Sequence, residues 1–88
     1  MYWIIADQLL RSSFSVGANI AEGFGKYKGK EYPRFIQIAL GSARETEYWL
    51  ELLVDINPKL KKEVQKIIDL NTQTVKMLIS TLYTLKNK

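Results

Sequence analysis

Two clusters of basic residues are the groups in this chain best suited to chemistry, and that chemistry is contact with phosphate. The first interleaves cations with aromatic rings: Lys26, Tyr27, Lys28, Lys30, Tyr32 and Arg34. The second consists of Lys59, Lys61, Lys62 and Lys66. Lysines neutralise backbone phosphates and tyrosines stack on bases, so these residues and Arg44 are candidate nucleic-acid contacts. A solvated loop and a solvated helix start are the alternative interpretations.

The first cluster lies in a glycine-rich stretch, Gly23 to Gly29, just before a predicted helix. Backbone N–H groups and lysines in such a loop are able to hold a phosphate. The spacing matches neither the Walker A pattern nor the dinucleotide-binding fingerprint. Nucleotide hydrolysis is therefore not predicted.

No constellation of residues predicts catalysis. The chain contains no histidine and no cysteine, which excludes imidazole and thiolate chemistry and most zinc sites. Glu47, Glu51 and Asp55 recur every four residues, a spacing that could serve a hard metal, but a solvated helix face is the better interpretation. Asn19 and Glu22 have no nucleophile beside them and are expected to cap or link helices. We expect no enzyme activity, no cofactor, no metal and no small-molecule substrate.

The composition is that of one small globular domain covering residues 1–88, with 47% hydrophobic and 25% charged residues. The formal net charge of +4 permits binding to a polyanion without requiring it. Apolar runs of four or five residues are far shorter than the roughly 20 that cross a bilayer, and Asp7 comes too early for a secretory signal. We expect a cytoplasmic protein without membrane contact.

Three long helices are predicted, over about residues 2–22, 30–56 and 58–85, in an all-α up-and-down bundle. Glycines 23, 25 and 29 mark the first break, and Pro33 fits the first turn of the second helix. Asn57 and Pro58 mark the second break, as N-cap and first helical residue.

The second predicted helix has one polar stripe, consisting of Arg34, Gln37, Gly41, Arg44, Tyr48, Glu51 and Asp55. Apolar and small residues fill the wide remaining arc, with Ala39, Ser42, Ala43 and Thr46 near its centre and Phe35, Ile36, Ile38, Leu40, Trp49, Leu50, Leu52 and Leu53 around them. A surface helix needs an apolar stripe of only about 100°, so this helix must be covered from more than one side. Copies of the chain are therefore expected to associate.

The outer two helices each have one apolar face. In the first, Ile5, Leu9, Val16 and Ile20 share a face beside a polar line formed by Gln8, Ser12, Ser15, Asn19 and Glu22, which solvent or buried partners must satisfy. In the third, the inward residues are Leu60, Val64, Ile67, Ile68, Val75, Leu78, Leu82 and Leu85, and the stretch 71–74 weakens the stripe. Arg34 and Glu45 are expected to pair with groups on other helices.

Two stretches resemble a known family. The segment QLLRSSFSVGANIAEG at residues 8–23 and the segment KEYPRFIQIALGSARE at residues 30–45 are similar to the bacterial four-helix-bundle proteins described as 23S ribosomal RNA intervening-sequence proteins. The resemblance covers the chain from about Asp7 onward. Its motif residues here are Asn19, Glu22, Gly23, Arg34, Ser42 and Glu45, which suit helix-linking roles better than a reaction.

The resemblance implies a bundle that assembles into a ring, typically a homopentamer, with no enzymatic activity. A related accessory protein of diversity-generating retroelements binds nucleic acid and a reverse transcriptase through a basic surface, which makes RNA or a nucleoprotein the expected partner. The chain departs from the family at Gly17, where proline is frequent. It also has only residues 1–6 where family members carry most of a first helix, which implies a truncated or a shorter natural form.

The function expected from these observations is a self-associating, non-enzymatic module that contacts RNA or a nucleoprotein through its basic surface. The alternative is a structural scaffold that docks a protein through the apolar arc or the acidic line Glu47, Glu51 and Asp55, with no nucleic-acid role.

Overall fold

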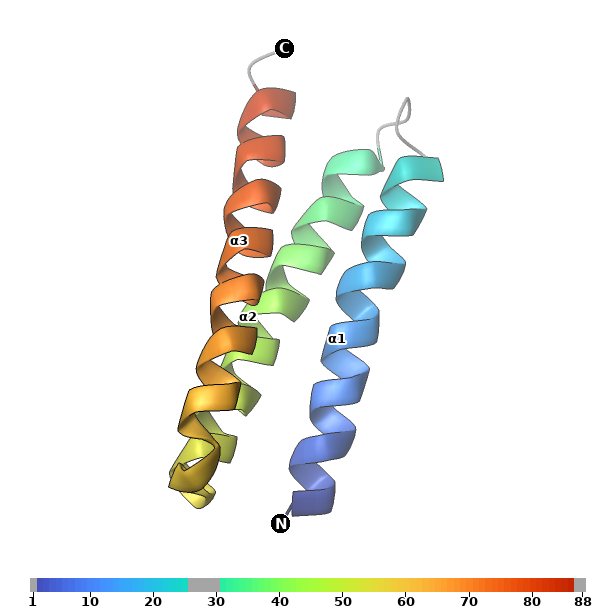
Figure 1. The fold of residues 1–88 in the computed structure, drawn as a ribbon. Coiled ribbons are helices and arrows are strands. Elements are labelled where there is room, and N and C mark those ends of the chain that lie inside the picture. The colour runs from blue at the N-terminus through green and yellow to red at the C-terminus, as the bar shows by residue number, and fades with distance from the viewer. Residues whose placement is uncertain (1, 26–30, 87–88) are drawn as a thin grey trace.

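The computed structural model of the protein describes residues 2–25 and 31–86 as an all-α arrangement of three long helices (Figure 1). They are α1 (Tyr2–Gly25), α2 (Tyr32–Ile56) and α3 (Lys61–Lys86), with a 3₁₀ turn, η1 (Pro58–Leu60), before α3. The helices run up and down, as predicted, and α2 packs against both α1 and α3. Among the described residues, no Cα of α1 lies within 8 Å of a Cα of α3.

The helix ends follow the predicted breaks with one difference. Helix α1 continues to Gly25, three residues past the predicted end, because Gly23 is buried against the start of α2. A Cβ at Gly23 would lie 3.1 Å from a ring carbon of Tyr32, so the missing side chain allows the two helices to approach. At the other end, the Asn57 side chain accepts a hydrogen bond of 3.2 Å from the Lys59 N–H, as expected of an N-cap.

The centre of the wide apolar arc of α2 is the most buried part of the molecule. Ala39 and Ala43 are completely buried, and Thr46 is nearly so. Ile36, Ala39 and Leu78 form the core cluster, with Ile20 of α1 and Leu82 of α3 packed against it. The apolar arc of α2 is therefore covered by α1 on one side and by α3 on the other. Every residue of the predicted polar stripe of α2 is exposed.

Two residues predicted to face inward are exposed. Ile67 of α3 is 49% exposed because it borders a groove between α1 and α3 that no other described segment fills. Ile38 of α2 is 40% exposed, because it lies at the edge of the arc rather than at its centre. The remaining inward positions predicted for α3 are buried or half-buried.

Candidate nucleic-acid interface

The four lysines of the second cluster line one open hollow of about 570 Å³ at the start of α3. Lys59 comes from η1, and Lys61, Lys62 and Lys66 come from the first two turns of α3. The hollow is completed by Pro58, Gln65 and one acidic residue, Asp69. We call this feature the lysine hollow.

The positive charge of the lysine hollow is not neutralised within the described residues. The ion pair found among the described residues joins Arg11 of α1 to Glu45 of α2. None of the four lysines takes part in an ion pair there. The lysines also stand near the N-terminal end of α3, where the helix dipole is already positive. A bound anion would relieve both effects.

The described members of the first cluster, Tyr32 and Arg34, lie at the start of α2, and the lysine hollow lies beyond the other end of this helix. The last turn of α1 and the first turn of α2 lie at one end of the molecule, and η1 and the start of α3 lie at the other (Figure 1). The 25 residues of α2 separate these ends by about 38 Å. Lys26, Tyr27, Lys28 and Lys30 themselves lie outside the described residues. Arg34 and Arg44 are exposed on the polar stripe of α2, away from the lysine hollow.

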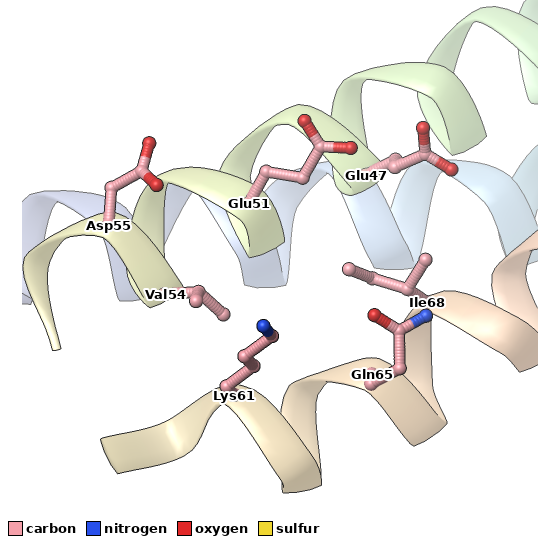
Figure 2. A pocket seen from close by; sticks show the side chains of 7 residues that line it. All are labelled: Glu47, Glu51, Val54, Asp55, Lys61, Gln65 and Ile68. Atoms are coloured by element: carbon pink, nitrogen blue, oxygen red, sulfur yellow. The ribbon is translucent and has the colours of Figure 1, made fainter. Parts of the chain in front are cut away.

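The acidic line of α2 borders a second groove, of about 390 Å³, between α2 and α3. Glu47, Glu51 and Asp55 follow one another along α2, and Lys61, Gln65 and Ile68 come from α3 on the facing side (Figure 2). In the part of the chain that the structure describes, no group of three acidic residues converges on a position that could hold a metal ion. Lys61 belongs to both grooves, so it marks the boundary between the acidic and the basic surface.

Buried partners satisfy most of the polar line of α1. The Ser15 and Ser42 hydroxyls are 2.7 Å apart, and the Thr46 hydroxyl donates to the Ser12 hydroxyl at 2.9 Å. The Asn19 amide donates to the Ser15 carbonyl at 2.8 Å, which extends this chain of hydrogen bonds along α1. We call these five residues the hydroxyl seam; it joins α1 to α2 without a charged group.

The other motif residues divide into linking and exposed groups. Glu45 forms an ion pair with Arg11 of α1 and accepts a hydrogen bond of 2.9 Å from the Trp49 indole, so the expected cross-helix pairing of Glu45 is confirmed. Arg34 was expected to pair in the same way, but it is exposed and forms no ion pair or hydrogen bond with another described residue. Glu22 is also exposed. The motif therefore acts mainly at the α1–α2 interface, through Asn19, Gly23, Ser42 and Glu45.

Three contributors to the helix interfaces were not predicted. Arg11 is the partner of Glu45, and Thr46 bonds to Ser12. Asn71, in the stretch that weakens the apolar stripe of α3, donates to the Ala43 carbonyl at 2.8 Å and so ties α3 to α2. In the sequence, Asn71 is a polar residue at a position where the helical repeat places an inward-facing apolar side chain. This interruption was the signal that could have identified Asn71 as a residue that links helices.

The comparisons with known proteins decide the family. The family described as "23S rRNA-intervening sequence protein" matches residues 3–80. The chain belongs to this family. No protein of curated function matches it.

A crystal structure of a related protein shows the same fold. It is described as a protein of unknown function from the S23 ribosomal protein family of Bacteroides thetaiotaomicron VPI-5482. The two chains are 37% identical with a TM-score of 0.84, over 90% of this chain and 73% of the other. The shared fold agrees with the all-α arrangement of this intervening-sequence protein, while the function of the structural relative is unknown. Within the described residues, no helix is long and apolar enough to cross a membrane.

Proposed function

We propose that this intervening-sequence protein is a non-enzymatic, self-associating cytoplasmic module that binds structured RNA through the lysine hollow. The observation that carries the proposal is the convergence of Lys59, Lys61, Lys62 and Lys66 on one open surface with no described ion pair to neutralise them. Four cations near the positive end of a helix favour a ligand with closely spaced negative charges. A nucleic-acid backbone has that property.

Self-association is supported by the balance of buried and exposed apolar groups. Of the described residues, seven hydrophobic ones are buried, while fourteen large hydrophobic side chains are exposed. An 88-residue chain has a thin core, and association is one of the usual ways to cover such an excess.

The RNA proposal is tested by measuring filter binding to a structured RNA as salt rises. Four phosphate contacts predict that affinity falls roughly 50- to 150-fold between 50 and 200 mM salt. Absence of binding at 50 mM, or binding indifferent to salt, would contradict the proposal.

The lysine hollow is tested by a pair of charge-matched double variants on α3. Lys62→Gln with Lys66→Gln removes two charges from the hollow, whereas Lys76→Gln with Lys86→Gln removes two exposed charges farther along the same helix. The first variant should lower the salt slope by about 1.5 to 2, and the second should leave it nearly unchanged. Equal losses in both would mean that binding follows net charge and has no specific surface.

A protein scaffold is the second candidate function, and the acidic groove between α2 and α3 favours it. Three carboxylates beside Val54 and Ile68 would suit a basic, amphipathic helix. A Glu47→Gln, Glu51→Gln, Asp55→Asn variant separates the two functions. It should bind RNA at least as well as the native protein if the lysine hollow is the site, and it should lose a protein partner if the acidic groove is.

A further inference from the structure

The lysine hollow is a patch of charge and not a single row. Lys59 and Lys66 mark its two ends, about 12 Å apart along η1 and α3. Lys61 precedes Lys66 by five residues, so the directions of these two side chains around α3 differ by about 140°. On a helix that is about 10–12 Å across, this angle separates the two side chains by roughly 10 Å. The positive charge therefore covers an area that is nearly as wide as it is long.

Carboxylates limit the lysine hollow on two sides. Asp69 closes it along α3 and accepts a hydrogen bond of 2.9 Å from the Gln65 amide, which holds the carboxylate beside the lysines. On the side of α2, Glu51 and Asp55 line the adjoining groove, and the Lys61 side chain points from α3 toward α2 (Figure 2). A chain of phosphates that left the hollow along α3 or across α2 would approach these negative groups.

The lining of the lysine hollow contains no aromatic ring among the described residues. It consists of the four lysines with Pro58, Gln65 and Asp69. In the described part of the chain, the exposed aromatic side chains belong to α1, to α2 and to Tyr83, which follows Lys66 by about 26 Å along α3. Proteins that hold single-stranded nucleic acid combine a basic groove along the backbone with aromatic side chains that stack on successive bases. The lysine hollow has neither feature.

A nucleic-acid duplex matches the shape of this patch. Its two strands place phosphates along both sides of a groove, and their charge per unit length is twice that of one strand. A patch of about 12 by 10 Å therefore meets phosphates of both strands, whereas a single strand crosses it in one line and meets fewer lysines. Contacts to phosphates need no aromatic ring and no base edge.

We infer that the lysine hollow recognises the paired backbone of double-helical RNA and discriminates against single strands, an inference that rests on the RNA binding proposed above. Lys59, Lys62 and Lys66 contact phosphates of both strands, and the site reads no base sequence. Asp69 determines the specificity, because its carboxylate lies between Lys66 and Lys76 on the outer side of α3, where a single strand would have to pass.

A perfectly paired RNA duplex and each of its two strands alone, chosen so that neither strand folds on itself, test the inference. Fluorescence anisotropy measures their binding at two salt concentrations. Four phosphate contacts predict that affinity for the duplex falls roughly 150-fold between 50 and 200 mM salt, whereas two contacts predict a fall of about sevenfold for a strand. At 50 mM salt the duplex should bind at least about tenfold tighter than either strand. A second duplex of different sequence should bind within about threefold of the first.

A charge-matched pair of variants tests the role of Asp69. Asp69→Asn removes the negative charge and keeps an oxygen that accepts from Gln65. It should raise single-strand affinity by about eightfold at 50 mM salt, the value of one further phosphate contact, and duplex affinity by less than about threefold. Asp7→Asn makes the same change of charge at an exposed residue of α1 that does not line the hollow, and it should raise both affinities equally. An equal gain for both RNAs in Asp69→Asn would overturn the role of Asp69.

The outcomes separate this inference from the proposed function. Absence of binding to every RNA at low salt overturns both. A strand that binds as tightly as the duplex overturns duplex recognition and leaves RNA binding standing. A preference of more than about tenfold between the two duplex sequences overturns recognition through the backbone. Duplex binding that the Lys62→Gln, Lys66→Gln variant retains in full overturns the lysine hollow as the site.

Discussion

The α1–α2 interface and the outward side of α1, which carries Trp3 and Phe14, are two sides of the same helix, and only the first is closed by another described helix. At the α1–α2 interface, Ser12, Ser15 and Asn19 find partners in a continuous seam, and Gly23 lets Tyr32 approach. On the outward side, Trp3 and Phe14 are largely exposed.

The difference shows what each side of α1 contributes. Small hydroxyl side chains bring two backbones close and fix their register through directed hydrogen bonds. Large aromatic rings at helix-packing intervals expose apolar area, but the hydrophobic effect is not directional and does not fix how a partner would pack on them. The closed side thus specifies the fold of the chain, whereas the open side leaves apolar area that no described helix covers.

The largest expected effect breaks a closed interface. Leu78 is 1% exposed in the core cluster, so Leu78→Ala should lower the free energy of unfolding by about 2–4 kcal/mol. Ile79→Ala, at a half-exposed neighbour, should cost less than about 1 kcal/mol. Urea unfolding at one fixed protein concentration measures both. Equal costs would contradict the described packing of α3 on α2.

The next effect concerns the hydroxyl seam. Thr46→Val removes a hydroxyl whose single hydrogen is within reach of both the Ser12 hydroxyl, at 2.9 Å, and the Ser42 carbonyl, at 2.8 Å, and should cost about 1–2 kcal/mol. In a double-mutant cycle with Ser12→Ala, the two losses should fall short of additivity by about 0.5–1 kcal/mol. Full additivity would show that the two hydroxyls do not interact.

Two glycine substitutions compare the outward side of α1 with the polar stripe of α2. Gly17 and Gly41 are both exposed within helices, and each has free space where the methyl group of an alanine would lie. Gly41→Ala should stabilise the protein by about 0.5–1 kcal/mol through helix propensity. Gly17→Ala should give a similar gain, because no described atom lies where its methyl group would go. Thermal melts measure both gains, and a loss of stability in Gly17→Ala alone would show that another helix packs against Gly17.

The smallest effect concerns the exposed ion pair. Glu45→Gln should cost about 0.5 kcal/mol, because the Arg11 and Glu45 side chains are 56% and 36% exposed and salt screens their attraction. The difference from the native protein should shrink in 0.5 M salt. A cost above about 2 kcal/mol, independent of salt, would contradict this expectation, because Gln keeps an oxygen that can accept from the Trp49 indole.

The helices and the core were predictable because each depends on local chemistry or periodicity. Pro33, Asn57 and Pro58 mark helix starts through backbone geometry, and the polar stripe of α2 follows from the 3.6-residue repeat. The polar line of α1 was recognised as needing partners. Its partners Ser42 and Thr46 were not predictable, because pairing them with Ser15 and Ser12 requires the register between two helices.

The candidate site was less predictable for the same reason. That Lys59, Lys61, Lys62 and Lys66 share one surface follows from their spacing, but their distance from Arg34 depends on the direction and length of α2. The exposure of Ile67 also escaped prediction. Its apolar character places it on a packing face, and the sequence does not say whether that face is covered by the same chain.

The molar mass of the unmodified protein, measured by light scattering across a concentration series, tests the proposed self-association most directly. The proposed self-association predicts a mass that rises above the 10.2 kDa of one chain toward a multiple of it as concentration increases. A mass that stays at 10.2 kDa at the highest concentration would contradict self-association.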